Sequence, residues 1–113
     1  MISTISRDEI RSFMESGAPM TLIEALPEKY YRAEHLPGAI NIPHTEVEAG
    51  ATALLPDRDA LIVVYCASLA CRNSTIAAHT LGQLGYRNVR EYAEGKQDWS
   101  QAGLPMEGEG VQS

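Results

Sequence analysis

The chain has 113 residues, the length of a single domain, of which 44% are hydrophobic and 21% are charged. This composition is near the globular average and excludes disordered, collagen-like and coiled-coil proteins. The formal net charge is −6, and no stretch gathers lysine and arginine, so nucleic acid would be repelled. The first residues lack the regions of a signal peptide, and no apolar run approaches the roughly 20 residues that cross a bilayer. We therefore expect a cytoplasmic protein that binds neither nucleic acid nor a membrane.

The first half of the chain predicts three helices and two extended segments. Ser6 and Glu9 form a capping box, and the apolar residues after them share one helix face, which predicts a helix over Arg7–Ser16. The other elements are a buried strand at residues 20–25, a charged helix at 27–34, a short extended segment at 40–42 and a weak helix at 45–55.

The clearest element is a strand at residues 61–65, which is continuous, β-branched and typical of a parallel sheet covered on both faces. Three elements follow: a helix with an apolar face from Ile76 to Leu84, a strand at residues 88–92, and a short helix that contains Trp99. The alternation of strands and helices predicts a single α/β domain with a parallel sheet over residues 1–106. Residues 107–113 are expected to form a polar, solvated tail.

The loop after the strand at 61–65 contains both cysteines of the chain, Cys66 and Cys71. It lies where open α/β sheets bind their ligands, and its small residues lead directly into a helix. Backbone amides of such a loop can bind an anion and would stabilise a thiolate, which makes Cys66 a candidate nucleophile. The alternative is that Cys66 is only a small buried residue at a strand end.

Five motifs, in this order, resemble those of the rhodanese (sulfurtransferase) family. They are Leu-Ile-Glu-Ala-Leu at 22–26, His-Leu-Pro-Gly-Ala-Ile-Asn-Ile-Pro at 35–43, Ile-Val-Val-Tyr-Cys at 62–66, Leu-Gly-Tyr-Arg-Asn-Val at 84–89, and the ending at 94–99 and 102–105. The resemblance implies a three-layer α/β fold with a central parallel sheet flanked by helices. It also implies that Cys66 carries a persulfide from a donor such as thiosulfate to an acceptor such as cyanide, a small thiol or a protein thiol.

The resemblance further implies roles for the rest of the loop. The substrate-binding residues expected from it are Ala67, Ser68, Leu69, Ala70, Arg72 and Asn73. Arg72 would attract an anionic donor, and Cys71 would modulate or resolve the persulfide. No cofactor is expected, and two cysteines without a paired Cys or His motif predict no metal site. The oligomeric state is open.

The loop departs from the family where a six-residue loop carries arginine, because Cys71 stands there and Arg72 follows. Counted from Cys66 to Arg72, the loop resembles that of phosphatase and arsenate-reductase relatives and predicts an oxyanion hydrolase or reductase. Counted to Cys71, it predicts a thiol pair, whose disulfide would require Cα atoms within about 7 Å. We rank sulfur transfer above oxyanion hydrolysis, because the loop offers no general acid to protonate a leaving oxygen. For the two cysteines, we expect mainly free thiols. A third alternative is a non-catalytic binding or redox-sensing module.

Other polar residues receive structural interpretations. Glu24-Ala25-Leu26 replaces the family's Asp-Val-Arg at the first core strand, so Glu24 needs a new partner. His35 is expected to orient the turn at residues 36–38 through hydrogen bonds. His44 and His79 are expected to be solvated.

Overall fold

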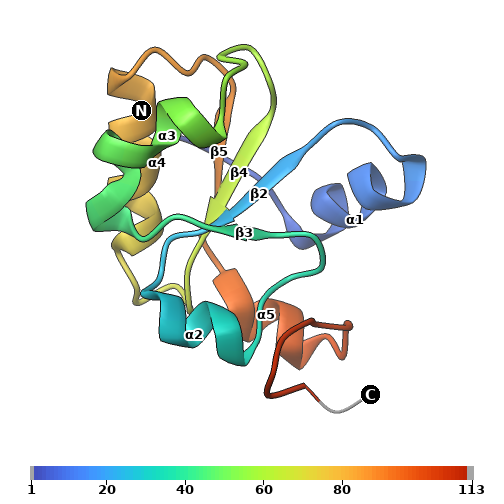
Figure 1. Cartoon of the computed structure of the whole chain (residues 1–113). Coiled ribbons are helices and arrows are strands. Elements are labelled where there is room, and N and C mark those ends of the chain that lie inside the picture. Colours follow the sequence, from blue (N-terminus) through green and yellow to red (C-terminus); the bar gives the residue numbers. More distant parts are fainter. Residues whose placement is uncertain (1, 112–113) are drawn as a thin grey trace.

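A computed structural model describes residues 2–111 of the chain. Its centre is a parallel five-stranded sheet in the order β1-β5-β4-β2-β3 (Figure 1). The strands are β1 (Ser3–Thr4), β2 (Thr21–Glu24), β3 (Ile40–Asn41), β4 (Ile62–Tyr65) and β5 (Val89–Tyr92). Four of them lie within the segments predicted as extended.

Helices cover both faces of the sheet and make the three layers that the family resemblance implies (Figure 1). The helices are α1 (Arg7–Ser16), α2 (Glu28–Ala33), α3 (Val47–Leu54), α4 (Asn73–Gln83) and α5 (Gly95–Gln101), with a 3-10 turn at His44–Glu46. One face packs against α3 and α4 and the other against α1 and α5. Within residues 2–111, no helix is long and apolar enough to span a membrane.

Strand β4 forms the middle of the core because all four of its side chains are fully buried. Ile62 and Val64 contact the cluster under α3 and α4, while Val63 and Tyr65 contact the cluster under α1 and α5. This alternation follows from the two-residue period of a strand, and it confirms that the strand is covered on both faces.

Helix α1 begins as the capping box predicts. The Ser6 hydroxyl accepts a hydrogen bond from the Glu9 amide at 3.1 Å, and the Glu9 carboxylate accepts one from the Ser6 amide at 3.2 Å. The helix ends at Gly17, whose φ of 73° is a left-handed conformation that glycine adopts without a steric penalty.

Three features of the fold differ from the sequence analysis. The exposed edge strand β1 was not predicted, because two polar residues carry no periodic signal. The helix expected over 45–55 is divided into the 3-10 turn and α3. Helix α4 begins at Asn73, three residues before its first predicted apolar position.

The segment expected to be a solvated tail is exposed but tied to α2. Glu107 and His35 form an antiparallel bridge, with N···O distances of 2.8 and 2.9 Å. The amides of Glu109 and Gly110 donate to carbonyl groups at the end of α2, each at 2.8 Å. The last two residues of the predicted tail, 112 and 113, lie outside the described part of the chain.

Candidate active site

Cys66 directly follows β4, the central strand, and is 1% exposed. Residues 67–72 form the loop that leads from this strand to α4, whose N-cap is Arg72. The buried strand therefore fixes the position of the Cys66 sulfur, while the loop after it lies near the surface.

Helix α5 holds the beginning of this loop through two backbone hydrogen bonds. The amide of Lys96 donates to the Cys66 carbonyl, and the amide of Gln97 donates to the Ala67 carbonyl, each at 2.9 Å. Gly95 permits this close approach, because its φ is 64° and an added Cβ would clash with the Cys66 carbonyl oxygen. Gly95 belongs to the family-like ending of the sequence, yet its link to the loop was not foreseen.

Inside the loop, Ser68 organises a turn. Its carbonyl accepts a hydrogen bond from the Cys71 amide at 3.0 Å, and its hydroxyl accepts one from the Ala70 amide at 3.3 Å. Several other amides of the loop and of the first residue of α4 donate to no acceptor within residues 2–111: those of Ala67, Ser68, Leu69, Arg72 and Asn73. These groups are available to an anion at the loop.

The two cysteines are joined by a disulfide, with Cα atoms 6.4 Å apart. The expectation of free thiols is therefore wrong for this structure. The physical reason is the turn at Ser68, which folds the loop back and brings Cys71 to Cys66. The geometry shows that the two sulfur atoms can reach each other without rearrangement of the sheet.

A cleft of about 490 Å³ lies beside the loop. Ala67 and Ser68 line it, together with residues of α2 and α5 that include Tyr30, Lys96 and Gln97. The other four predicted substrate-binding residues are not part of its lining: Leu69, Ala70, Arg72 and Asn73. Leu69 is 74% exposed, and Arg72 is also exposed, so the structure does not gather the predicted residues around one cavity.

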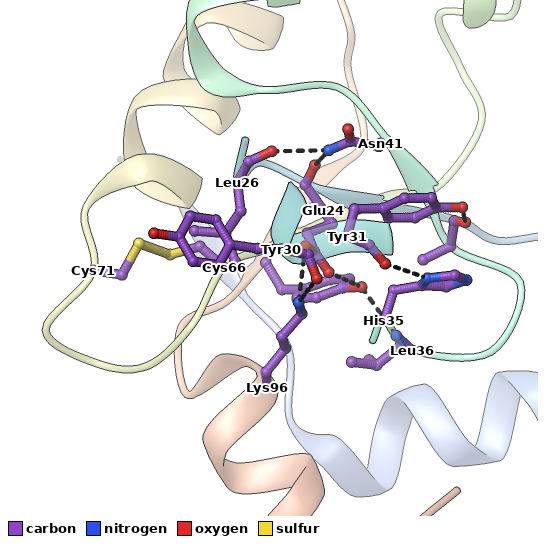
Figure 2. A network of polar contacts seen from close by, with 12 residues as sticks. Glu24, Leu26, Tyr30, Tyr31, His35, Leu36, Asn41, Cys66, Cys71 and Lys96 are labelled. Carbon is purple, nitrogen blue, oxygen red and sulfur yellow. Dashed lines mark hydrogen bonds and ion pairs between the residues drawn. A yellow bond between two sulfur atoms is a disulfide. The ribbon is translucent and has the colours of Figure 1, made fainter. Parts of the chain in front are cut away.

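Glu24 finds its missing partner in Lys96, which lines the same cleft (Figure 2). The Lys96 ammonium lies 2.9 Å from one oxygen of the fully buried Glu24 carboxylate, and the Tyr65 hydroxyl donates to the other at 2.9 Å. Lys96 also donates to the Tyr30 carbonyl at 3.0 Å. Burial raises the pKa of Glu24, and Lys96 opposes this shift. Burial and the Glu24 carboxylate together raise the pKa of Tyr65.

The histidines occupy positions that differ in part from the expectations. His35 stacks on Tyr31, donates a hydrogen bond from Nδ1 to the Tyr31 carbonyl at 2.8 Å, and lies 3.7 Å from the Glu107 carboxylate. The side chains that hold the turn at 36–38 are Glu107, which accepts from the Gly38 amide at 3.0 Å, and Tyr65, whose hydroxyl accepts from the Leu36 amide at 3.1 Å. His44 is half-buried rather than fully solvated, because the 3-10 turn that contains it packs against α4. Its buried Nδ1 has no hydrogen-bond partner within residues 2–111. His79 is exposed.

Ser74 contacts the Cys66 sulfur and links it to Glu91, and the sequence analysis missed both residues. The Ser74 hydroxyl lies 3.4 Å from the Cys66 sulfur and donates to the Glu91 carboxylate at 2.7 Å. The sequence did show a charged residue, Glu91, within the strand predicted at 88–92. The alternation of residues along a strand does not show which neighbouring element such a side chain contacts. Within the described residues, no cluster of three potential ligands is placed to hold a metal ion.

The sequence model of the rhodanese-like domain family matches residues 6–102 of the chain. The HTH-type transcriptional regulator Rv0324 of Mycobacterium tuberculosis is 37% identical over 103 residues, which cover 91% of this chain and 44% of the regulator. The thiosulfate sulfurtransferase PspE of Escherichia coli is 41% identical over 73 residues, covering 65% of this chain and 66% of PspE. The chain thus spans less than half the length of the regulator.

Solved structures give the same result for the fold. The human single-domain sulfurtransferase TSTD1 has a TM-score of 0.77 and 27% identity, covering 89% of this chain and 97% of that protein. The BH2092 protein of Bacillus halodurans has a TM-score of 0.88 and 25% identity, covering 96% of this chain and 78% of that one. With the family match over residues 6–102, these likenesses show that the chain belongs to the rhodanese-like domain family, which includes sulfurtransferases.

Proposed function

We propose that this protein transfers sulfane sulfur from a small donor such as thiosulfate to cyanide or a thiol, through a persulfide on Cys66. The position of Cys66 carries the proposal. Cys66 lies at the end of the central strand and opens a loop in which several amides have no acceptor within residues 2–111, and the next two residues line a cleft. The relatives named as sulfurtransferases support the same chemistry.

In the first half-reaction, the Cys66 thiolate attacks the outer sulfur of thiosulfate. A bond forms between the two sulfur atoms, the bond from the outer sulfur to the sulfonate breaks, and sulfite leaves with the electron pair. The amides of the loop stabilise the negative charge of the thiolate and of the persulfide. Arg72, exposed at the start of α4, attracts the anionic donor at longer range.

In the second half-reaction, the acceptor attacks the outer sulfur and Cys66 leaves as a thiolate. Cys71 offers a second route when no acceptor is bound. Its thiolate attacks the inner sulfur of the persulfide, hydrosulfide leaves, and the Cys66–Cys71 disulfide forms. The reach between the two cysteines supports this route, and an external thiol must then reduce the disulfide.

Intact-mass measurement of the reduced protein after thiosulfate tests the nucleophile. We expect a gain of one sulfur atom that a reductant removes, and that is absent in Cys66→Ser. The gain should be longer-lived in Cys71→Ser, which lacks the second route. A gain that survives in Cys66→Ser would overturn the assignment. Activity on an aryl phosphate, measured in parallel, would instead favour the oxyanion hydrolase.

A second candidate function is a redox- or sulfur-sensing module. The Cys66–Cys71 disulfide favours it, and so does the similarity to a protein named as a transcriptional regulator. A sensor would take up one sulfur atom, or form the disulfide, without multiple turnovers. Steady thiocyanate production from thiosulfate and cyanide therefore distinguishes the enzyme from the sensor.

A further inference from the structure

The two cysteines of the disulfide differ in their exposure to solvent. Cys66 directly follows the central strand and is 1% exposed, whereas Cys71 is half-buried on the loop (Figure 2). The rate at which a nucleophile attacks a disulfide depends on which of the two sulfur atoms it can reach. A nucleophile that arrives from solvent therefore has better access to Cys71 than to Cys66.

Nearby charges add to this difference when the nucleophile is an anion. The Ser74 hydroxyl contacts the Cys66 sulfur at 3.4 Å and donates to the Glu91 carboxylate at 2.7 Å, so a negative charge lies one hydroxyl group away from Cys66. Arg72 directly follows Cys71, is exposed, and has no ion-pair partner within residues 2–111. An anion is therefore attracted to the Cys71 end of the disulfide.

Backbone amides on either side of Cys71 in the sequence also favour an anion. The amides of Leu69, Arg72 and Asn73 donate to no acceptor within residues 2–111. None of these three residues, nor Cys71 itself, lines the cleft beside the loop. The groups around Cys71 thus suit a small anion that needs no cavity to bind.

We propose that the oxidised protein takes up sulfur from hydrosulfide, with Cys71 as the residue that carries it. Hydrosulfide is a sulfur nucleophile, an anion and small, so it meets all three conditions. This activity goes beyond the proposed function, because it starts from the disulfide and places the sulfur on Cys71. The reaction with thiosulfate starts from the reduced protein and places the sulfur on Cys66.

Atoms and electrons balance with the disulfide as the oxidant. Hydrosulfide attacks the Cys71 sulfur, a new sulfur–sulfur bond forms, and the bond to Cys66 breaks with its electron pair on Cys66. The sulfur of hydrosulfide is oxidised to sulfane sulfur, and the disulfide is reduced. The proton of hydrosulfide passes to Cys66, whose thiol lies within hydrogen-bond distance of the Ser74 hydroxyl. Cys71 then holds a persulfide.

The reaction also returns the protein to its reduced form. A thiol acceptor attacks the outer sulfur of the persulfide, and Cys71 leaves as a thiolate. Both cysteines are then free, which is the state in which Cys66 attacks thiosulfate. Hydrosulfide and the acceptor together therefore replace a separate reductant for the disulfide.

The test uses protein that has been oxidised until it has no free thiol. It is treated with sodium sulfide, and the reaction is stopped early with excess iodoacetamide in denaturant. We expect a gain of one sulfur atom per chain. Chymotrypsin cleaves after leucine, so cleavage at Leu69 separates the two cysteines, and mass spectrometry should find the alkylated persulfide on Cys71 and an alkylated thiol on Cys66.

Three results would overturn the proposal. They are sulfur found on Cys66, no uptake of sulfur, and thiols that stay free after oxidation. Reduced wild type and Cys71→Ser are the controls, because neither contains the disulfide that must accept the electrons. Both should gain no sulfur from sulfide, and a gain equal to that of the oxidised protein would show that the disulfide is not the oxidant.

Arg72→Gln tests the attraction of the anion. We expect the rate of sulfur uptake to fall about fivefold, the effect of one close unit charge in water. Arg87→Gln is the matched control, because it changes the net charge equally while Arg87 is exposed and pairs with Asp59, away from the loop. Equal rates in the two variants would refute the role given to Arg72.

The two sulfur sources can fail independently. Thiosulfate is given to the reduced protein and should place sulfur on Cys66, whereas sulfide is given to the oxidised protein and should place it on Cys71. Uptake from sulfide without uptake from thiosulfate would overturn the proposed function alone. Uptake from thiosulfate without uptake from sulfide would overturn the hydrosulfide reaction alone.

Discussion

Replacement of Lys96 by methionine tests the buried ion pair next to the cleft. Lys96→Met keeps most of the side-chain volume but removes the ammonium that lies 2.9 Å from the Glu24 carboxylate. Glu24 is fully buried and keeps only the hydrogen bond from the Tyr65 hydroxyl. The folded variant must therefore either bury an uncompensated charge or protonate Glu24.

Breaking a buried pair on one side costs about 3–5 kcal/mol, and the remaining Tyr65 hydrogen bond favours the lower value. For a domain of this size, about 3 kcal/mol corresponds to a decrease in Tm of about 12 °C. The loss also depends on pH. Burial already raises the pKa of Glu24, and removing Lys96 raises it further. The penalty is then full above the raised pKa and shrinks as the pH falls toward the unfolded value of about 4.3.

Urea unfolding of wild type and Lys96→Met at neutral pH and near pH 5 measures both effects. The matched control is the double variant Glu24→Leu with Lys96→Met, which removes both charges and should recover most of the stability. A single variant within about 0.5 kcal/mol of wild type, or a deficit that grows with falling pH, would refute the reasoning.

Three further predictions concern stability and can be measured by urea unfolding. Gly95→Ala should destabilise the protein far more than Gly103→Ala, because both glycines have positive φ but only at position 95 does the new Cβ clash with the loop. Equal losses of about 1–2 kcal/mol would show that the positive φ alone determines the cost of both substitutions. Ser6→Ala should cost about 1 kcal/mol through the lost cap of α1, whereas Ser12→Ala on the exposed side of that helix should be nearly neutral. Trp99→Ala, which empties a site that is 2% exposed, should cost about 3–5 kcal/mol, and a smaller loss would mean that the core under α5 collapses into the space.

Most of the fold could be predicted because its elements carry strong local signals. The continuous β-branched run of β4 and the capping box before α1 are decided by neighbouring residues alone, and both are confirmed. The edge strand β1 has no such signal, because Ser3 and Thr4 become a strand only by pairing with β5. The tail likewise gains its order from contacts with α2, more than seventy residues earlier in the chain.

The candidate site was predictable in position but not in its partners. The end of β4 could be recognised from the order of strand, loop and helix, which placed Cys66 at the carboxyl end of that strand. The contacts of the site depend on which residues distant segments bring there. Lys96 on α5 pairs with Glu24 on β2, and Glu91 on β5 binds Ser74 next to Cys66. The distance between these residues along the sequence does not indicate either contact. Arg72 was expected to attract an anionic donor, yet it does not line the cleft.

The hydrogen bonds from Lys96 and Gln97 to the loop have a consequence for biosynthesis. Both cysteines leave the ribosome 25 to 31 residues before the two amides that hold their loop, and a domain generally folds as a unit. A fragment that ends before residue 95 contains the complete thiol pair but lacks these two amides. In such a fragment the Cys66 and Ala67 carbonyl groups lose their donors, so we expect the loop with both thiols to be less ordered there than in the chain that includes α5.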